Sequence, residues 1–223
     1  MLNIKFIQSN FIEKFEATVS KLGYEQKGIW FSEMLFIYMF YQQFKPEVFI
    51  ETGRARGQST VCLSRLLPST EIISIEHDKE SEDAIIAEKR LLKCKNVQMI
   101  YGDAFKESRN LANKNNFLAL IDGPKNEAAV KLAQQFLKDE LCVGVFMHDC
   151  AKGKISRAFE EIHNGISFFS DDEGFCSAFS YLDKECYNKK RQPYSNNGIR
   201  QQSYGPTVGL FLKEGTSAGK LSI

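Results

Sequence analysis

The stretch from Val48 to Thr60 constrains the fold more than any other part of this 223-residue chain. It reads V-F-I-E-T-G-R-A-R-G-Q-S-T: three apolar residues and an acid, then two glycines, then the start of a helix-periodic apolar pattern. Glycine tolerates positive φ and lets a ligand approach the backbone. The first amides of a helix have no partner within the helix and can face that ligand. The stretch therefore predicts a strand, a tight turn and a helix N-terminus, arranged to bind a ligand.

Two nucleotide-binding patterns do not fit this turn. The dinucleotide fingerprint G-x-G-x-x-G needs glycine where Ala55 and Gln58 stand. The phosphate-loop pattern needs a lysine after its last glycine, and Gln58 follows Gly57. From these residues alone, a structural corner without a ligand stays open as the alternative.

Strand-like and helix-like segments alternate after this corner. Strands are predicted at residues 71–76, 97–101, 117–121 and 142–147, with helices at 79–92, 104–113 and 126–138 between them. Repeated units of this length imply right-handed crossovers and a parallel sheet covered on both faces. We therefore predict one α/β domain at residues 46–213, Rossmann-like, with a mostly parallel seven-stranded sheet.

Two helices are predicted before this domain, so that residues 1–45 form a helical extension. The second, at residues 29–44, is apolar nearly all round and too short to span a bilayer comfortably. We predict that it is buried against the sheet edge, with a homo-oligomer contact as the alternative. The polar segment 187–204 could be a lid, a basic surface patch or a mobile loop, and residues 214–223 are predicted to be a flexible tail.

Charge and cysteine content narrow the class of protein. A formal net charge of +1 gives no general attraction to nucleic acid or to an anionic membrane. The first nine residues lack the pattern of a secretory signal. Six cysteines show no C-x-x-C spacing, which indicates reduced thiols in a cytoplasmic protein and no structural zinc site.

Five consecutive predicted strands end in or shortly before an acid. In an open parallel sheet, ligands bind beyond the carboxyl ends of the strands. Like charges on one rim repel each other unless a ligand or a cation uses them. We therefore expect a binding site that is lined by these acids: Glu51, Glu76, Asp103, Asp122 and Asp149.

Over residues 46–150, these features resemble the class I S-adenosylmethionine (SAM) dependent methyltransferases in order and spacing. The first motif of that family is acid-x-Gly-x-small-x-Gly, and Ala55 stands at the position of its middle glycine. The resemblance implies that the last strand, around residues 208–212, runs antiparallel to the rest. It also implies that the protein is a SAM-dependent transferase.

The resemblance assigns cofactor contacts residue by residue. Glu51 would lie beneath the amino acid part of SAM, and Glu76 would accept both ribose hydroxyls. His77 would flank the adenosine, and Asp122 would lie near the methionine amine or the reaction centre. The turn around the cofactor and the contact to the adenine edge would be made by Thr52, Gly53, Ala55, Gly57, Ser59, Asp103 and Ala104.

The fourth and fifth strand ends, I-D-G-P-K and M-H-D-C, resemble those of cation-dependent O-methyltransferases of the catechol and macrocin types. In that family, Asp122 and Asp149 would hold a divalent cation such as Mg²⁺, which acidifies the acceptor hydroxyl. Cys150 stands where catechol-type members have Asn. His148 could be a general base, a ligand or a hydrogen-bonded structural residue.

The expected activity is O-methylation of a small molecule, a sugar or a secondary metabolite. An NAD(P)-dependent oxidoreductase is the first alternative, because Glu76 would also suit a nicotinamide dinucleotide. A non-catalytic module that binds a nucleoside cofactor is the second.

Overall fold

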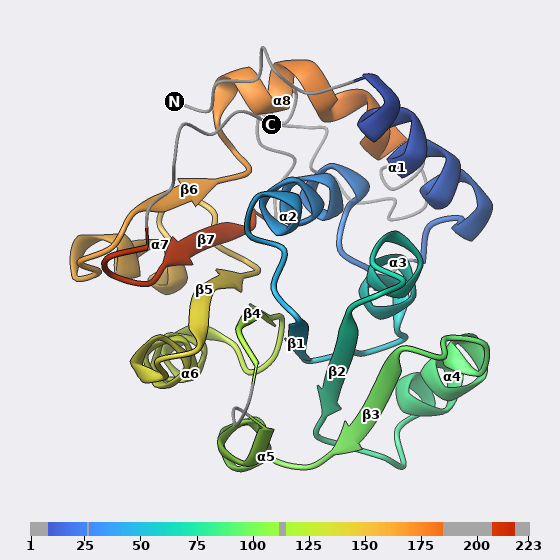
Figure 1. The fold of residues 1–223 in the computed structure, drawn as a ribbon, viewed down its shortest axis with the longest axis horizontal. Helices are drawn as coiled ribbons and strands as arrows, with labels where there is room; N and C mark the ends of the chain where they lie inside the picture. Colours follow the sequence, from blue (N-terminus) through green and yellow to red (C-terminus); the bar gives the residue numbers. More distant parts are fainter. Residues whose placement is uncertain (1–8, 26, 112–114, 185–206, 217–223) are drawn as a thin grey trace.

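A computed structural model describes residues 9–25, 27–111, 115–184 and 207–216 of the chain. Seven strands form one sheet in the order β3-β2-β1-β4-β5-β7-β6 (Figure 1). Strands β1 to β5 run parallel, and β7 runs antiparallel to both β5 and β6. The predicted Rossmann-like sheet with an antiparallel last strand is confirmed. The strands are β1 Val48–Thr52, β2 Glu71–Glu76, β3 Val97–Tyr101, β4 Phe117–Ile121, β5 Cys142–Met147, β6 Ser167–Phe169 and β7 Gly209–Leu212.

Helices cover both faces of the sheet (Figure 1). The side chains of each strand alternate between these faces: Phe49 packs with α2, whereas Val48 and Ile50 pack in the core with α6. One face carries α1 Ser9–Leu22, α2 Phe31–Phe44, α3 Gln58–Leu66, α4 Glu82–Leu91 and α8 Glu173–Phe179. The other carries α5 Ala104–Leu111, α6 Asn126–Lys138, α7 Ile155–Ala158 and the short 3₁₀ turn Phe159–Glu161.

Helix α2 lies over the middle of the sheet, which corrects the predicted position at the sheet edge. The strand order places β1, β4 and β5 at the centre, and Phe36 packs edge-to-face on Phe146 of β5. On its outer side α2 is covered by α1 and α8, where Phe11 stacks on Tyr38 and Phe175 meets Phe36. Every residue of α2 from position 31 to 41 is buried in its own chain. Over these residues the helix packs within its own chain, and the homo-oligomer contact stays a prediction.

The first residue of α4 is set by a helix-capping serine. The helix was expected from residue 79 but begins at Glu82, because the hydroxyl of Ser81 caps it by accepting from the amide of Ala84 at 3.1 Å. Serine is a preferred N-cap residue, since its side chain satisfies an amide that has no helical partner.

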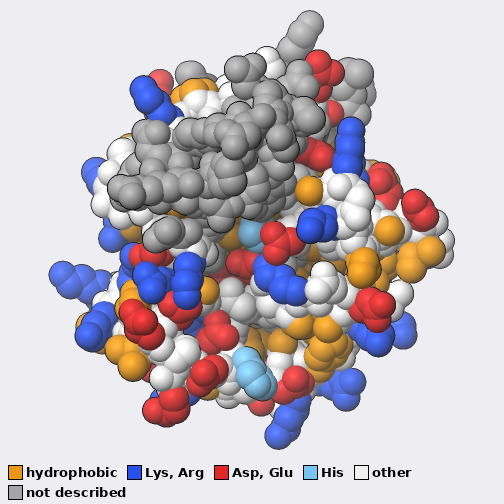
Figure 2. Space-filling view, turned by 180° about the vertical axis from the view of Figure 1, so that it is seen from behind, with side chains coloured by type: hydrophobic (Ala, Val, Ile, Leu, Met, Phe, Trp, Pro, Cys, Tyr) orange, Lys and Arg blue, Asp and Glu red, His pale blue; other side chains and the backbone are white. Residues whose placement is uncertain are grey.

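Several predicted features lie outside the described residues, among them the segment 187–204, most of the C-terminal tail and Cys186. The five described cysteines are free thiols, and four of them are buried. None of the described helices is long and apolar enough to cross a membrane. Acidic and basic side chains intermingle on the face shown in Figure 2, in keeping with the low net charge.

Candidate functional site

The parallel strands end at one edge of the sheet, as the sequence predicts. The register pairs Thr52 with Ile75 and Ile121, and Ile121 with Met147. The acids at or just after these ends therefore share one rim: Glu51, Glu76, Asp103, Asp122 and Asp149. Their surroundings differ, and so do the chemical roles open to them.

The turn after β1 has left-handed backbone at three alternate residues. The φ angle is 82° at Gly53, 44° at Ala55 and 74° at Gly57. A residue with a Cβ atom costs about 1–2 kcal/mol in this conformation. The position of Ala55 thus favours glycine by geometry, which accounts for its place in the acid-x-Gly-x-small-x-Gly motif.

Glu51 lies beneath this turn and is fully buried. Its carboxylate accepts hydrogen bonds from the hydroxyls of Ser59 and Thr60, and from that of Ser74 at 2.7 Å. Burial raises the pKa of Glu51 although these hydrogen bonds oppose the shift. Glu51 fixes the turn to α3 and β2, and this is the support that a cofactor above the turn would need.

Glu76 reaches the same turn from the end of β2. One of its oxygens accepts from the amide of Ala55 at 2.8 Å, and the other accepts from the amide of His77 at 2.8 Å. A carboxylate has about four lone-pair positions, so the bonds that hold it still leave acceptor capacity for hydroxyls. His77 itself is exposed beside it.

Asp103 is exposed and caps α5, where its Oδ1 accepts from the amide of Lys106 at 3.0 Å. Ala104 begins that helix and is half-buried. An N-cap aspartate is commonly a purely structural residue. If Asp103 contacts adenine as predicted, its carboxylate must do so while it also caps α5.

The N-terminus of α3 opens directly above the glycine turn. Val61 is the first residue of the helix to donate to a helical carbonyl, that of Gly57, at 3.0 Å. The hydroxyl of Thr52 is buried below and has no hydrogen-bond partner among the described residues. Helix N-termini attract negatively charged groups. Turn, helix end and Glu76 together fit a ligand with hydroxyls at one end and an anionic group at the other, as SAM has.

The segment that joins α1 to α2 crosses this turn; we refer to its described residues 24–25 and 27–29 as the strap. Gln58 holds the strap at two points, since its side chain donates to the carbonyl of Ile29 at 2.9 Å and accepts from the amide of Glu25. Gly28 lies so close that a Cβ atom there would be 2.4 Å from the Gln58 side chain. The strap is therefore one wall of the site.

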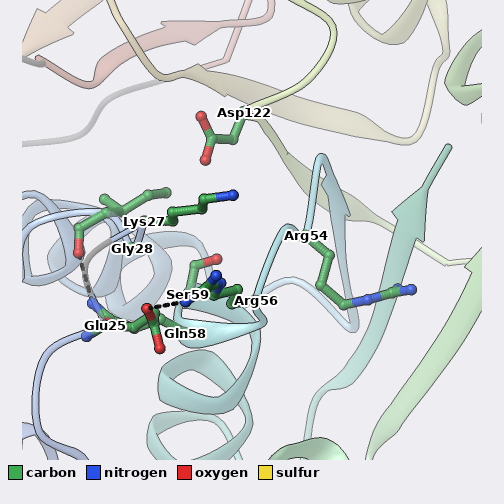
Figure 3. A pocket seen from close by; sticks show the side chains of 9 residues that line it. Glu25, Lys27, Gly28, Arg54, Arg56, Gln58, Ser59 and Asp122 are labelled. Carbon is green, nitrogen blue, oxygen red and sulfur yellow. Dashed lines mark hydrogen bonds and ion pairs between the residues drawn. The ribbon is translucent and has the colours of Figure 1, made fainter. Parts of the chain in front are cut away.

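A narrow pocket, without room for a water molecule, lies between the strap and the glycine turn (Figure 3). Its walls include Lys27 and Gly28 of the strap, Ser59 of α3 and Asp122 after β4. A ligand could therefore enter this pocket only if the strap or the side chains beside it moved apart.

A cluster of charged side chains follows β4 and β5. The ammonium of Lys125 lies 2.5 Å from Asp122 Oδ1 and 2.7 Å from Asp149 Oδ2. His148 Nδ1 lies 2.7 Å from Asp122 Oδ1, and its Nε2 lies 3.5 Å from Glu33 Oε2. The structure thus brings together the three predicted residues Asp122, His148 and Asp149.

These contacts fix the charges of the cluster. Burial by itself would lower the pKa of His148, but the carboxylates of Asp122 and Glu33 outweigh it and raise that pKa to about 10. The pKa of Asp122 falls well below its usual range, because the charges of His148 and Lys125 overcome the effect of burial. The pKa of Asp149 is lowered and that of Lys125 is raised. At neutral pH the cluster holds two cations and ionised carboxylates.

The same residues form the one group of possible metal ligands found in the described part of the chain, with ligand atoms of Asp122, His148 and Asp149 within 4.8 Å of one another. Two of the three are carboxylates, which suit Mg²⁺. Lys125, however, already bridges the two carboxylates, so a cation would have to displace its ammonium. Because this ammonium neutralises both carboxylates, the two acids can lie close together while both are ionised.

Two members of this cluster were not singled out from the sequence. Lys125 stands three residues after Asp122 in the I-D-G-P-K turn, so its spacing offered a signal. The sequence offered no such signal for Glu33, because this residue belongs to α2 and comes close to His148 only when α2 packs on the sheet.

Comparison with known proteins agrees with this geometry. A family model described as "Putative methyltransferase" matches residues 45–120, the part of the chain that holds the glycine turn, Glu76 and Asp103. A search of curated proteins gave no match.

Solved structures match nearly the whole chain. Cofactor-bound Rv0187 from MTB is 13% identical, covers 93% of this chain and 91% of its own, and has a TM-score of 0.53. A structure titled "putative O-methyltransferase" from Klebsiella pneumoniae is 14% identical, with coverage of 95% and 94% and a TM-score of 0.51. TomG from Streptomyces achromogenes, an O-methyltransferase of tomaymycin synthesis in complex with SAM, is 13% identical, with coverage of 94% and 92% and a TM-score of 0.50.

The chain has the methyltransferase fold. The family model and this fold together support a SAM-dependent methyltransferase. At 13–14% sequence identity, the similarity to these structures shows only that the fold is shared.

Proposed function

We propose that this protein transfers a methyl group from SAM to a hydroxyl oxygen of a small molecule. The observation that carries the proposal is the glycine turn itself. Left-handed backbone at positions 53, 55 and 57, the amide of Ala55 on Glu76, and the N-terminus of α3 lie together inside the segment that the methyltransferase family model matches.

The cofactor contacts follow from the positions described above. Glu76 would accept the ribose hydroxyls with the capacity that Ala55 and His77 leave, and Glu51 would support the turn from below. The glycine turn and the start of α3 would surround the amino acid part, and Asp103 with Ala104 would flank the adenine. The residues proposed to contact the cofactor are Glu51, Thr52, Gly53, Ala55, Gly57, Ser59, Glu76, His77, Asp103, Ala104 and Asp122.

When bound, SAM supplies a methyl group on a positively charged sulfur, and transfer leaves S-adenosylhomocysteine (SAH). The acceptor oxygen forms the new bond to carbon, the sulfur keeps the electron pair of the broken bond, and the hydroxyl proton must move to a base. The chain's first task is therefore to hold the acceptor in line with the methyl group. Positioning of this kind can account for much of the rate.

The proton acceptor has to come from the charged cluster. His148 carries hydrogen on both ring nitrogens while it lies between Asp122 and Glu33, so it must lose a proton before it can act as the base. Asp149 is ionised and its side chain is 44% exposed, and it can therefore approach an entering hydroxyl. The geometry favours His148 as the residue that orients Asp122.

Asp122 and Asp149 would hold a divalent cation in exchange for the ammonium of Lys125. Such a cation would lower the pKa of a coordinated hydroxyl. Lys125, once displaced, would remain within reach of that hydroxyl, because it now lies 2.5 and 2.7 Å from the two carboxylates. We expect O-methylation because a hydroxyl that is coordinated to this cation would lose its proton more readily.

A non-catalytic module is the second candidate, since a fold can keep a cofactor site without an acceptor site. Incubation with SAM and a panel of hydroxylated small molecules, sugars included, separates the two. We expect SAH and a methylated product, and we expect Asp149→Asn to abolish turnover but to leave SAH binding intact. Asp139→Asn, at the opposite edge of the sheet, is the matched control. SAH binding without product from any acceptor would favour the module.

The cation is tested in the same assay. Loss of turnover in excess chelator and its return with Mg²⁺ would support the carboxylate pair as ligands. Turnover that is unchanged in chelator but lost in His148→Ala would discard the metal and make the histidine the base.

A further inference from the structure

A hollow of about 530 Å³ lies between the C-terminal ends of α3 and α4 and the loop before β3, at the edge of the sheet opposite the candidate site. Its volume is in the range of small-molecule sites, roughly 300–1,000 Å³. Among the described residues, its lining contains no acid and four cations: Arg65, Arg90, Lys93 and Lys95. In a chain whose formal net charge is +1, this is a local excess of positive charge.

Three of these cations are exposed and form no ion pair within the described part of the chain: Arg65, Lys93 and Lys95. Arg90 differs, because its Nη2 lies 2.9 Å from Glu25 Oε2. The three unpaired cations repel one another unless an anion lies between them. The hollow therefore has unmatched charge as well as space.

The ends of the two helices explain only part of this charge. Arg65 and Arg90 stand in the last turns of α3 and α4, where the helix macrodipole favours cations. Lys93 and Lys95 stand beyond the last residue of α4, and the effect of the macrodipole falls off within the last turn. These two lysines have no such explanation.

The wall of the hollow at Asn96 is held by hydrogen bonds. The amide of Asn96 donates to the carbonyls of Leu67 and Thr70, both at 2.9 Å, and its side-chain oxygen accepts from the hydroxyl of Ser64 at 2.5 Å. These bonds occupy carbonyls that follow α3 and that would otherwise present negative partial charge to an anion. The hollow is therefore preformed on this side and does not repel an anion there.

A second hollow adjoins the first and brings an acid. The two share Pro68, Lys95 and Asn96, and the second is also lined by Glu71, which is exposed. A long polyanion that left the first hollow in this direction would meet a like charge. The arrangement favours a compact anion over an extended nucleic-acid strand.

We propose that the first hollow binds a compact anion with two or more phosphate groups, held by Arg65, Lys93 and Lys95. Guanidinium and ammonium groups are the usual partners of phosphate oxygens. More than one phosphate is needed because the three cations come from two separate segments of the chain. The inference goes beyond the proposed methyl transfer and does not depend on it.

Calorimetry tests the site with inorganic tripolyphosphate, orthophosphate and uridine triphosphate, in about 0.15 M salt so that distant charges are screened. We expect tripolyphosphate to bind, and orthophosphate to bind at least about tenfold more weakly because it makes fewer charge-assisted hydrogen bonds. The ratio of the affinities for uridine triphosphate and tripolyphosphate shows whether a nucleotide or an inorganic polyphosphate is the better source of these phosphates.

Two triple variants separate the hollow from general electrostatics. The hollow variant combines Arg65→Gln, Lys93→Gln and Lys95→Gln. The control variant removes the same charge at exposed positions outside the hollow, and combines Lys131→Gln, Lys152→Gln and Lys154→Gln. We expect the hollow variant to weaken tripolyphosphate by at least about tenfold, and the control variant to weaken it by less than about threefold, since distant charges are screened.

A charge-preserving variant, Arg65→Lys with Lys93→Arg and Lys95→Arg, should keep most of the affinity. Absence of tripolyphosphate binding to the wild-type protein would overturn the proposal, and so would equal weakening by the hollow and control variants. Orthophosphate that binds as tightly as tripolyphosphate would refute the requirement for several phosphates. A short single-stranded RNA that binds more tightly than tripolyphosphate, and that the hollow variant no longer binds, would replace the compact ligand with a nucleic acid.

Discussion

Gly53 and Gly123 lie backbone against backbone, so that a Cβ atom on Gly53 would be 2.3 Å from the amide nitrogen of Gly123. Both amides of the second turn are fixed to the first, since Asp122 and Gly123 donate to the carbonyl of Thr52 at 2.9 and 3.0 Å. This contact sets the distance between the glycine turn and the carboxylate of Asp122. The glycine turn and the charged cluster are thus held together by two residues without side chains.

We expect Gly53→Ala to be strongly destabilising and to abolish SAH binding, because the new methyl group meets backbone that cannot move aside. Gly153→Ala is a close control: φ is 83° there, against 82° at Gly53, but nothing lies within 4 Å of its Cβ position. It should cost only the conformational part, about 1–2 kcal/mol, reduced by roughly 0.4–1 kcal/mol because alanine has less freedom than glycine in the unfolded chain. Denaturant unfolding of both variants measures the difference, and equal losses would show that the contact contributes nothing.

Ala55→Gly should not destabilise the protein. Relief of the left-handed conformation gains about 1–2 kcal/mol, and the greater freedom of glycine in the unfolded chain costs roughly 0.5–1 kcal/mol. Ala128→Gly, within α6, should lose about 1 kcal/mol and serves as the control. A loss at Ala55 as large as that at Ala128 would mean that its methyl group makes a contact the φ argument leaves out.

Lys125→Met should tighten the binding of a divalent cation at Asp122 and Asp149. The substitution removes the ammonium that lies between the two carboxylates, and they then repel each other unless another cation joins them. Titration with Mn²⁺ by calorimetry compares the variant with wild type, and Asp149→Asn added to it should remove the gain. If neither protein binds Mn²⁺, the carboxylate pair is not a metal site.

Asp183 should make stability depend on pH in the opposite sense to an ordinary salt-bridged acid. It is buried, and its carboxylate accepts from the amide and the hydroxyl of Ser32 at 2.9 and 2.5 Å. Burial raises its pKa to about 7, with Glu33 of α2 adding to the shift, and the thiol of Cys176 on α8 also lies nearby.

Since the folded-state pKa lies above the unfolded value of about 3.9, the folded protein binds more protons between these values. The stability from this group is complete below about pH 4 and is lost as pH rises toward 7. Asp183→Asn should flatten the decline of Tm between pH 5 and 8, whereas Asp172→Asn, at the N-cap of the neighbouring α8, should not. An unchanged slope in Asp183→Asn would assign the decline to other groups.

The strands from β2 to β5 could be predicted from the sequence to the residue, because each is an apolar run between turn signals. The rim of acids followed, since parallel strands end at one edge. Helix α2 was placed at the sheet edge because its apolar pattern reports burial but not position, which depends on the strand order. Its covering by α1 and α8 is likewise a tertiary property.

Residues of the candidate site could be predicted where they belong to a sequence motif. Contacts that depend on tertiary packing could not be predicted. The glycine turn, Glu76, Asp122, His148 and Asp149 could all be found by spacing. The charge of His148 could not, because it depends on Glu33, which approaches from a helix more than a hundred residues earlier in the chain. The position of Lys125 between two acids could not be predicted either, because it depends on how the turns after β4 and β5 come together.

The most direct test of the account is a calorimetric titration of SAH and NAD into the wild-type protein and Glu76→Gln. We expect SAH to bind with a Kd in the micromolar range, roughly −8 kcal/mol, and NAD not to bind. Glu76→Gln replaces charged hydrogen bonds to the ribose, worth about 1.5–3 kcal/mol each, and should weaken SAH by at least about tenfold. NAD binding without SAH binding, or SAH binding that Glu76→Gln leaves unchanged, would contradict the site described here.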